Sequence, residues 1–227
     1  MIKTLIFDWD GTLHETAGLY GHAFRKAYCM LVKEGYAEER LYRDEDVSCY
    51  LGMNVNDMWN SFMPDLPRNV QLKAAGIIGD EMIAGIEAGH AKLYPDAADT
   101  LDVLKQEGYE QVILSNCKRA YLEAHRRAFG LDKWFSGFYC CEDYGFAPKE
   151  EIFPEISKRH PADYVVIGDR DSDIKVSETH NLVSIGCLYG YGSAEELKSA
   201  TYTVCSLAEI PGFLAGLKVR DDAPGKQ

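Results

Sequence analysis

Positive charge is scarce in this sequence of 227 residues, which has 24 lysine and arginine residues, 36 aspartate and glutamate residues and a net charge of −12. A general nucleic-acid-binding protein needs a basic face, so this balance argues against a nucleic-acid partner. It does not exclude phosphate esters, because a bound divalent cation can reverse the sign of the local field.

Long apolar runs and paired cysteines are also missing. No segment approaches about 18 uninterrupted apolar residues, so we expect no membrane partner. The apolar run near the start is too short for a signal peptide. The 7 cysteines are scattered without a CxxC pair, which favours free thiols in a reducing compartment. These absences predict a soluble, cytoplasmic protein. Whether it is a monomer or a homodimer stays open.

Short apolar runs are present instead, and they indicate strands. A continuous apolar run is typical of a strand that is buried on both faces of a parallel sheet. Helical patterns lie between the runs, and two of them end at Gly108 and Gly130. This alternation predicts an α/β fold with a doubly wound parallel sheet and a Rossmann-like core. The expected strands are residues 5–7, 112–114, 138–141, 164–167, 182–185 and 202–204.

The stretch from residue 15 to residue 90 interrupts this alternation. It contains apolar residues at helical spacing and no clear strand pattern. We therefore predict an all-helical inserted domain at residues 15–90 and a catalytic core made of residues 1–14 and 91–219. The polar tail at 220–227 is expected to be disordered. An insertion after the first strand would lie over the carboxyl ends of the strands, where open α/β sheets bind ligands.

Four groups of polar residues follow the expected strands. The strings DWDGT at residues 8–12 and SN at residues 115–116 follow the first two, Lys149 begins a helix after the third, and GDRDSD occupies residues 168–173. Each group alone has an ordinary explanation as a turn, a cap, a solvated lysine or an acidic helix start. Because parallel strands end at the same edge of a sheet, we expect the four groups to converge.

The residue types in these groups suit phosphoryl transfer. Asp8 can attack phosphorus to form an aspartyl-phosphate, and Asp10 can protonate the leaving oxygen and later activate water. A serine hydroxyl and a lysine can hold the phosphoryl group. The carboxylates after the fourth strand suit Mg²⁺, which binds one or two carboxylates together with waters and phosphate oxygens.

Taken together, the four groups resemble the motifs of the haloacid dehalogenase-like hydrolases, and the resemblance covers nearly the whole chain. The string LYPD at 93–96 resembles the family's return from the cap to the core, and residues 15–90 resemble the helical cap between the first and second motifs. The string GYGS at 190–193 is similar to a segment common in phosphoglycolate-phosphatase-like members. The resemblance implies a Mg²⁺-dependent phosphoric monoester hydrolase. It would hydrolyse a small phosphorylated metabolite through an aspartyl-phosphate on Asp8.

The resemblance also implies a role for each motif residue. Asp8 would be the nucleophile and Asp10 the general acid/base, with Ser115 and Lys149 completing the catalytic set. Asp8, the backbone carbonyl of Asp10, and Asp169 would bind Mg²⁺. Asp173 would support the metal through water or from behind its direct ligands. The residues that would bind substrate phosphate are Thr12, Ser115, Asn116 and Lys149.

Other activities of the family are less favoured. Dehalogenating members carry a different residue, usually tyrosine, at the position of Asp10, and phosphonate-cleaving members need a cap lysine that residues 51–53 lack. A phosphomutase is an alternative, although residues 48–50 include no basic residue. A non-catalytic phosphate-binding or regulatory module, such as a receiver-like domain, is another alternative. Phosphoglycolate, a sugar phosphate and a nucleoside monophosphate all stay open as substrates.

The third motif departs from the family pattern, in which lysine precedes proline. Here Pro148 precedes Lys149, and the expected lysine position falls on Ala147 when the following apolar pair is aligned. Lys118 and Arg119 are the alternative cations. In the cap and its hinge, the residues expected near the leaving group are His14, Glu15, Thr16, His22, Met53, Asn54, Met58 and Trp59.

Overall fold

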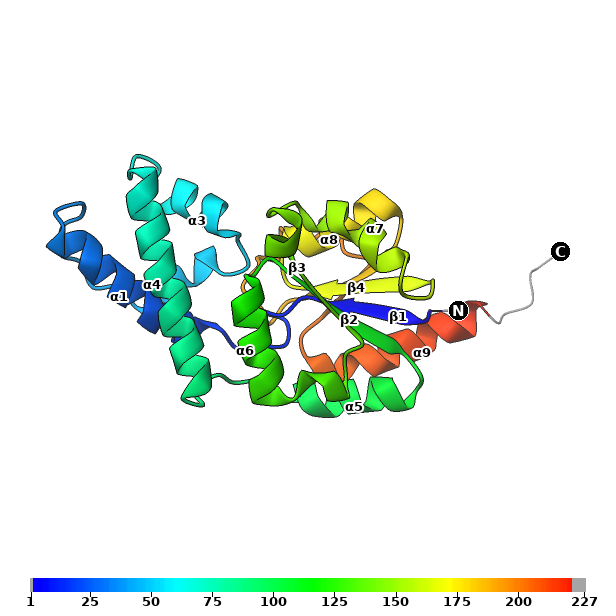
Figure 1. The fold of residues 1–227 in the computed structure, drawn as a ribbon. Coiled ribbons are helices and arrows are strands. Elements are labelled where there is room, and N and C mark those ends of the chain that lie inside the picture. Colours follow the sequence, from blue (N-terminus) through cyan, green and yellow to red (C-terminus); the bar gives the residue numbers. More distant parts are fainter. Residues whose placement is uncertain (1, 222–227) are drawn as a thin grey trace.

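A computed structural model describes residues 2–221, which form a helical cap beside an α/β core (Figure 1). The strands are β1 (Thr4–Phe7), β2 (Glu110–Ser115), β3 (Gly137–Cys140), β4 (Tyr164–Gly168), β5 (Val183–Cys187) and β6 (Tyr202–Val204). The cap helices are α1 (Ala17–Lys33), α2 (Asp44–Val47), α3 (Val55–Phe62) and α4 (Arg68–Glu87). The core helices are α5 (Ala97–Gln106), α6 (Arg119–Phe129), α7 (Lys149–Ser157), α8 (Asp171–His180) and α9 (Ile210–Asp221).

The described strands form one parallel six-stranded sheet in the order β3-β2-β1-β4-β5-β6. The chain winds outward from β1 to β3, returns to pair β4 with β1, and then continues outward to β6. Open α/β sheets bind ligands where the strand order reverses, here between β1 and β4. Asp8 follows β1 and Asp169 follows β4, so the first and fourth motifs meet at this point.

Both faces of the sheet are buried, which explains the continuous apolar runs. On one face, Ile6 and Val112 belong to the same apolar cluster as Ile152 and Ile156 of α7. On the other face, Ile113 joins the cluster that includes side chains of α5, α6 and α9. Figure 1 shows α7 and α8 on one side of the sheet and α5 and α9 on the other.

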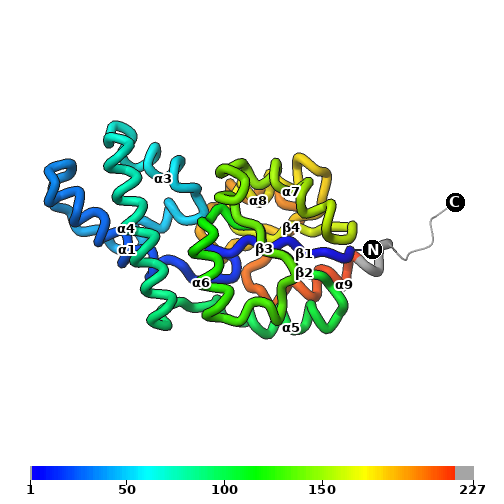
Figure 2. The backbone as a smooth tube through the Cα atoms, in the orientation of Figure 1, coloured from blue at the N-terminus to red at the C-terminus, as the bar shows by residue number. Residues whose placement is uncertain are grey.

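The cap is built on helices α1 and α4, which pack against each other (Figure 2). Apolar residues at helical spacing on α1 and α4 are buried, namely Phe24, Ala27, Tyr28, Leu31, Ala75, Ile78, Met82 and Ile86. The backbone N–H groups of Thr16 and Ala17, at the start of α1, donate to the hydroxyl oxygen of Tyr191 over 2.7 and 2.9 Å. One hydroxyl oxygen of a core loop therefore accepts hydrogen bonds from two free amides at the start of the cap.

The expected fold class is confirmed, and every expected strand is present within two residues of its expected bounds. The third strand ends earlier than expected, because Cys141 begins a 3₁₀ turn, η3 (Cys141–Tyr144), that ends at Gly145 with a φ of 65°. The domain bounds 1–14, 15–90 and 91–219 stay a prediction. Of the tail expected to be disordered, residues 220 and 221 end α9 and residues 222–227 lie outside the described residues. None of the described helices combines the length and apolarity needed to cross a membrane.

Strand β2 pairs with β1 on one side and β3 on the other, and its buried residues give a test of the core. Ile113 is fully buried, so Ile113→Ala should lower the free energy of unfolding by about 2–5 kcal/mol, as lost burial and a cavity add together. Leu41→Ala is the control, because Leu41 is 82% exposed and should change stability by no more than about 0.5 kcal/mol. Urea unfolding of both variants measures the difference. Equal effects would contradict the packing described for β2.

Candidate active site

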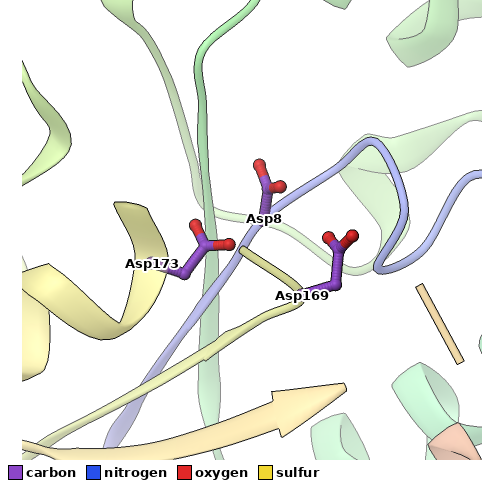
Figure 3. Close-up of side chains that lie close together, drawn as sticks. All are labelled: Asp8, Asp169 and Asp173. Carbon is purple, nitrogen blue, oxygen red and sulfur yellow. The ribbon is translucent and has the colours of Figure 1, made fainter. Parts of the chain in front are cut away.

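Three buried carboxylates lie together at the point where the strand order reverses. Asp8, Asp169 and Asp173 each offer an oxygen, and these oxygens lie within 4.8 Å of one another (Figure 3). Asp8 follows β1, Asp169 follows β4, and Asp173 belongs to the first turn of α8. This carboxylate cluster brings together acids that are about 160 residues apart in the chain.

Lys149 provides the positive charge that faces this cluster. Its Nζ donates to Asp8 Oδ1 over 2.7 Å and to Asp173 Oδ1 over 2.6 Å, and its side chain is 2% exposed. Burial works to lower the pKa of Lys149, but Asp173 and Asp8 outweigh burial and raise the pKa. Lys149 is therefore an ammonium that bridges two carboxylates, despite the reversed order of proline and lysine.

One ammonium does not balance three carboxylates, and the pKa shifts show the excess. Burial raises the pKa of Asp8 well above its usual value, with Lys149 opposing the rise and Asp173 and Asp169 adding to it. Burial and then Asp173 raise the pKa of Asp169 to about 7. A divalent cation would offset this repulsion, and a set of carboxylate oxygens is the kind of donor that Mg²⁺ prefers. The residues present therefore fit a Mg²⁺ site.

Asp169 is held in place by Thr12 and by the loop that contains the GYGS string. The Thr12 hydroxyl donates to Asp169 Oδ1 over 3.0 Å, and the backbone N–H of Tyr191 donates to Oδ2 over 2.7 Å. A Cβ atom added to Gly190 would lie 2.3 Å from Asp169 Cβ, and one added to Gly192 would lie 1.8 Å from the Asp169 backbone oxygen. Only glycine fits at either position, because the backbone approaches Asp169 so closely.

Asp10 points to a different set of partners. Its Oδ1 accepts from the Tyr121 hydroxyl over 2.6 Å and from the Thr16 hydroxyl over 2.7 Å, and lies 3.2 Å from His14 Nδ1. Burial works to raise the pKa of Asp10, but the hydrogen bond and charge of His14, together with the hydrogen bond from Tyr121, lower it overall. Asp10 is therefore a carboxylate in this arrangement.

A cavity with a volume of about 140 Å³ lies above Asp10, between the cap and the core. We refer to it as the Asp10 cavity. Its walls are mostly apolar, and Lys118 is the only lysine or arginine among the described residues that line it. Side chains that line it from the cap include Tyr20, Met53, Met58, Ile78 and Met82.

The remaining motif residues connect the core to the cap. The Asn116 side-chain amide donates to the backbone oxygen of Gly52 over 2.9 Å, and Arg170 Nη1 donates to the backbone oxygen of Leu51. Asn116 also accepts a hydrogen bond from the Cys141 thiol. The cap loop at Leu51 and Gly52 is thus held by residues that follow β2 and β4.

The expected phosphate-binding residues lie at the same edge of the sheet. Ser115 is the buried last residue of β2, next to Asn116. Thr12 is also buried, with its hydroxyl turned to Asp169. The roles predicted for Ser115, Thr12 and Asn116 stay predictions, as do those of the catalytic and metal-binding residues.

The residues expected near the leaving group fall into two sets. Those at the Asp10 cavity, or in contact with Asp10 itself, are His14, Thr16, Met53 and Met58. The others are turned elsewhere: Glu15 and His22 line a second cavity, Asn54 caps α3, and Trp59 is buried in the cap. Of the alternative cations, Lys118 lines the Asp10 cavity, whereas Arg119 pairs with Asp143 and Glu123.

Sequence reasoning did not identify the contacts of Tyr121 and Tyr191. Tyr121 fits the apolar spacing of α6, so the pattern indicated a core position rather than a partner for Asp10. A signal was available, since Tyr121 and His125 are polar aromatic residues one turn apart on the helix that follows the second motif. Tyr191 lies between two glycines of the GYGS string, a pattern that suggests close approach of the backbone.

Comparison with known proteins places the chain in a family. The model of the haloacid dehalogenase-like hydrolases matches residues 2–178. A structure of a predicted phosphatase from Clostridium acetobutylicum superposes with a TM-score of 0.82 at 22% identity, covering 95% of this chain and 99% of that one. At this identity the likeness shows the same fold, including the helical cap.

Curated relatives are phosphatases of small phosphorylated compounds. The chain is 25% identical to the phosphoglycolate phosphatase of Haemophilus influenzae over 44% of this chain and 47% of that protein, about half its length. It is 26% identical to the glyceraldehyde 3-phosphate phosphatase of Methanopyrus kandleri over 82% of this chain and 83% of that protein.

The excess of negative charge predicts that a site residue destabilises the metal-free protein. With EDTA at pH 8, Asp169→Asn should raise Tm by at least about 2 °C, which corresponds to about 1 kcal/mol for a chain of this size. The pKa of folded Asp169 is about 7, above the unfolded value of about 3.9. Its charge therefore costs stability above pH 7, and the gap in Tm should narrow as the pH falls below about 7 towards 4.

Asp132→Asn is the matched control for this measurement. A hydrogen bond from Arg126 lowers the pKa of Asp132, so removing its charge should not raise Tm at any pH. Differential scanning fluorimetry across pH 4–8 would compare the variants. A Tm for Asp169→Asn at or below that of the wild type at pH 8 would contradict the repulsion described for the cluster.

Proposed function

Because the chain belongs to the haloacid dehalogenase-like hydrolases, we propose that it is a Mg²⁺-dependent phosphatase that hydrolyses a small phosphate monoester. The observation that carries this proposal is the buried contact of 2.7 Å between Lys149 and Asp8, with Asp10 facing the adjacent cavity. The phosphatase activity of both curated relatives supports it.

The first step transfers the phosphoryl group to the protein. An Asp8 carboxylate oxygen attacks phosphorus in line, the bond from phosphorus to the ester oxygen breaks, and Asp10 protonates the departing alcohol. Lys149 stabilises charge on the phosphoryl oxygens, and Ser115 and the backbone after β2 orient the group. The product is an aspartyl-phosphate on Asp8 and a free alcohol.

The second step regenerates Asp8. Asp10, now a carboxylate, takes a proton from a water molecule, and the water oxygen attacks phosphorus. The bond from phosphorus to Asp8 breaks and inorganic phosphate leaves. The lowered pKa of Asp10 suits this step, because the group must be a base when water arrives.

Asp8, Asp169 and the backbone carbonyl of Asp10 would hold Mg²⁺, with Asp173 behind them. When bound, the cation neutralises charge on the phosphoryl oxygens and on the carboxylate cluster. We also infer a cytoplasmic location, supported by the seven cysteines, all of which have free thiols.

The volume of the Asp10 cavity favours a small leaving group. At about 140 Å³ it is close to a cavity of about 150 Å³ that accommodates benzene, and smaller than the range of about 300–1,000 Å³ for drug-sized ligands. A glycolate or triose moiety is within this size, whereas a nucleoside is much larger. Phosphoglycolate and triose phosphates are therefore better candidates than nucleoside monophosphates.

Hydrolysis of p-nitrophenyl phosphate tests the two-carboxylate mechanism. The wild type should turn over in Mg²⁺ and stop in EDTA. Asp8→Asn should lower kcat by at least about 1,000-fold because the nucleophile is lost. Asp10→Asn should lower kcat by about 100- to 10,000-fold because water is no longer activated. Asp65→Asn, at an exposed position in the cap, is the control. Turnover that survives both active-site substitutions would refute the assignment of Asp8 and Asp10.

The cavity predicts discrimination by size. We expect kcat/KM for phosphoglycolate or glyceraldehyde 3-phosphate to exceed that for adenosine monophosphate by at least about 10-fold. Met82→Ala should narrow this ratio, because Met82 lines the cavity from α4. Leu72→Ala, on the same helix but 54% exposed, should leave the ratio unchanged. Equal changes in the two variants, or a preference for the nucleotide in the wild type, would contradict the size argument.

A further inference from the structure

The hydrogen bonds of Asp10 converge on one of its two carboxylate oxygens. Tyr121, Thr16 and His14 all have their polar atoms within 3.2 Å of Oδ1. Among the described residues, none donates a hydrogen bond to Oδ2. The carboxylate is thus anchored through Oδ1, and Oδ2 is available to another group.

Tyr121 reaches Asp10 from a different part of the chain than the other two partners. Thr16 and His14 lie within six residues of Asp10, on the segment that leads into the cap, whereas Tyr121 is 111 residues away on α6. Tyr121 is 7% exposed, and its hydroxyl makes the shortest of the three contacts. It therefore ties Asp10 to a helix of the core, in addition to the two contacts from the segment that leads into the cap.

The Tyr121 ring is part of an aromatic box, whose other members are Trp9, His14 and His125. The His125 ring lies 4.2 Å from His14, 4.5 Å from Tyr121 and 5.1 Å from Trp9, measured between centroids. All of these side chains are at least nine-tenths buried. Neither nitrogen of His125 has a hydrogen-bond partner among the described residues, so His125 contributes to the box by the packing of its ring.

Burial, followed by the neighbouring His14, lowers the pKa of His125 to about 3, so this imidazole is neutral near pH 7. What the box supplies is a fixed direction for the Tyr121 O–H bond. The Tyr121 ring is buried and packs edge-on against His125 and His14, which limits its freedom to turn, so its hydroxyl is preorganised towards Oδ1.

We propose that Tyr121 is a positioning residue that fixes Asp10 by its Oδ1 atom so that Oδ2 transfers the proton to the leaving group. This inference rests on the proposed phosphatase function. Before the first step Oδ2 carries the proton that it took from water in the preceding turnover. In the first step this proton moves to the ester oxygen as its bond to phosphorus breaks, which leaves the alcohol neutral and Asp10 ionised. In the second step water returns a proton to Oδ2 as its oxygen attacks phosphorus.

The consequence of losing this anchor depends on the leaving group. An alkoxide is a poor leaving group and needs the proton from Asp10 as its bond to phosphorus breaks. The p-nitrophenolate anion is stabilised by its ring and departs with little help. The value of kcat/KM reports steps up to departure of the leaving group, so it separates protonation of the alcohol from later attack by water.

The experiment compares Tyr121→Phe with the wild type on an alkyl ester, glycerol 1-phosphate, and on p-nitrophenyl phosphate, both in Mg²⁺. The substitution removes one hydroxyl and keeps the ring that packs in the box. We expect kcat/KM for the alkyl ester to fall by about 10- to 100-fold, the factor for losing a hydrogen bond to a charged group. For p-nitrophenyl phosphate, kcat/KM should change by less than about 3-fold, since the leaving group needs little protonation.

Tyr164→Phe is the matched control, because it too removes one phenol hydroxyl. The Tyr164 hydroxyl donates to a backbone oxygen, and Tyr164 begins β4, so it lies at the opposite end of that strand from Asp169. It should leave the ratio of the two kcat/KM values unchanged. A Tyr121→Phe variant that loses equally on both esters, or on neither, would overturn the positioning role while the wild-type phosphatase activity still stood. A wild type that hydrolyses neither ester would instead overturn the proposed function, and the role of Tyr121 with it.

Discussion

The contact of Lys149 with Asp8 and Asp173 is the interaction on which the site depends. Burying carboxylates away from water is costly. In a cluster of three without a cation, the carboxylates would repel one another and would separate or become protonated. Lys149 donates to two of the three and is itself kept charged by them. Strand β1, helix α7 and helix α8 are thereby joined at one buried point, and Asp8 has a defined direction before any substrate arrives.

Residues of the motifs also hold the cap, so the chemistry and the shape of the cavity are linked. Asn116 and Arg170 donate hydrogen bonds to the cap loop at Gly52 and Leu51. The Tyr191 hydroxyl oxygen accepts a hydrogen bond from the backbone N–H of Thr16, and the Tyr191 backbone N–H donates to Asp169. A movement of the cap would therefore change the hydrogen bonds of Tyr191, which contacts Asp169, and of Asn116 after β2. Such coupling would suit the proposed mechanism, in which bulk water has to be excluded while the aspartyl-phosphate exists.

The same electrostatic interactions lower the stability of the folded chain when no cation is bound. The raised pKa values of Asp8 and Asp169 mean that the folded chain holds these groups at a cost, which a bound cation would offset. Asp10, two residues further on, is in the opposite state, because its hydroxyl and imidazole partners favour the charged form. Two carboxylates close in sequence thus have pKa values shifted in opposite directions, because Asp8 is buried beside two other carboxylates whereas Asp10 is held by hydrogen-bond donors.

The sequence by itself determined the sheet, the helical insertion and the meeting of Asp8 with Asp169. Apolar runs mark strands buried on both faces, and parallel strands must end at the same edge, so residues that follow them converge whatever the details of packing. Three things depended on tertiary structure. Lys149 reaches Asp8 although its order with proline is reversed, Tyr121 anchors Asp10, and the loop at Gly190 and Gly192 closes on Asp169. Each of these is a contact between side chains or backbone that are far apart in the chain. Local periodicity reports which face of an element is buried, but it carries no information about which distant group that face will meet.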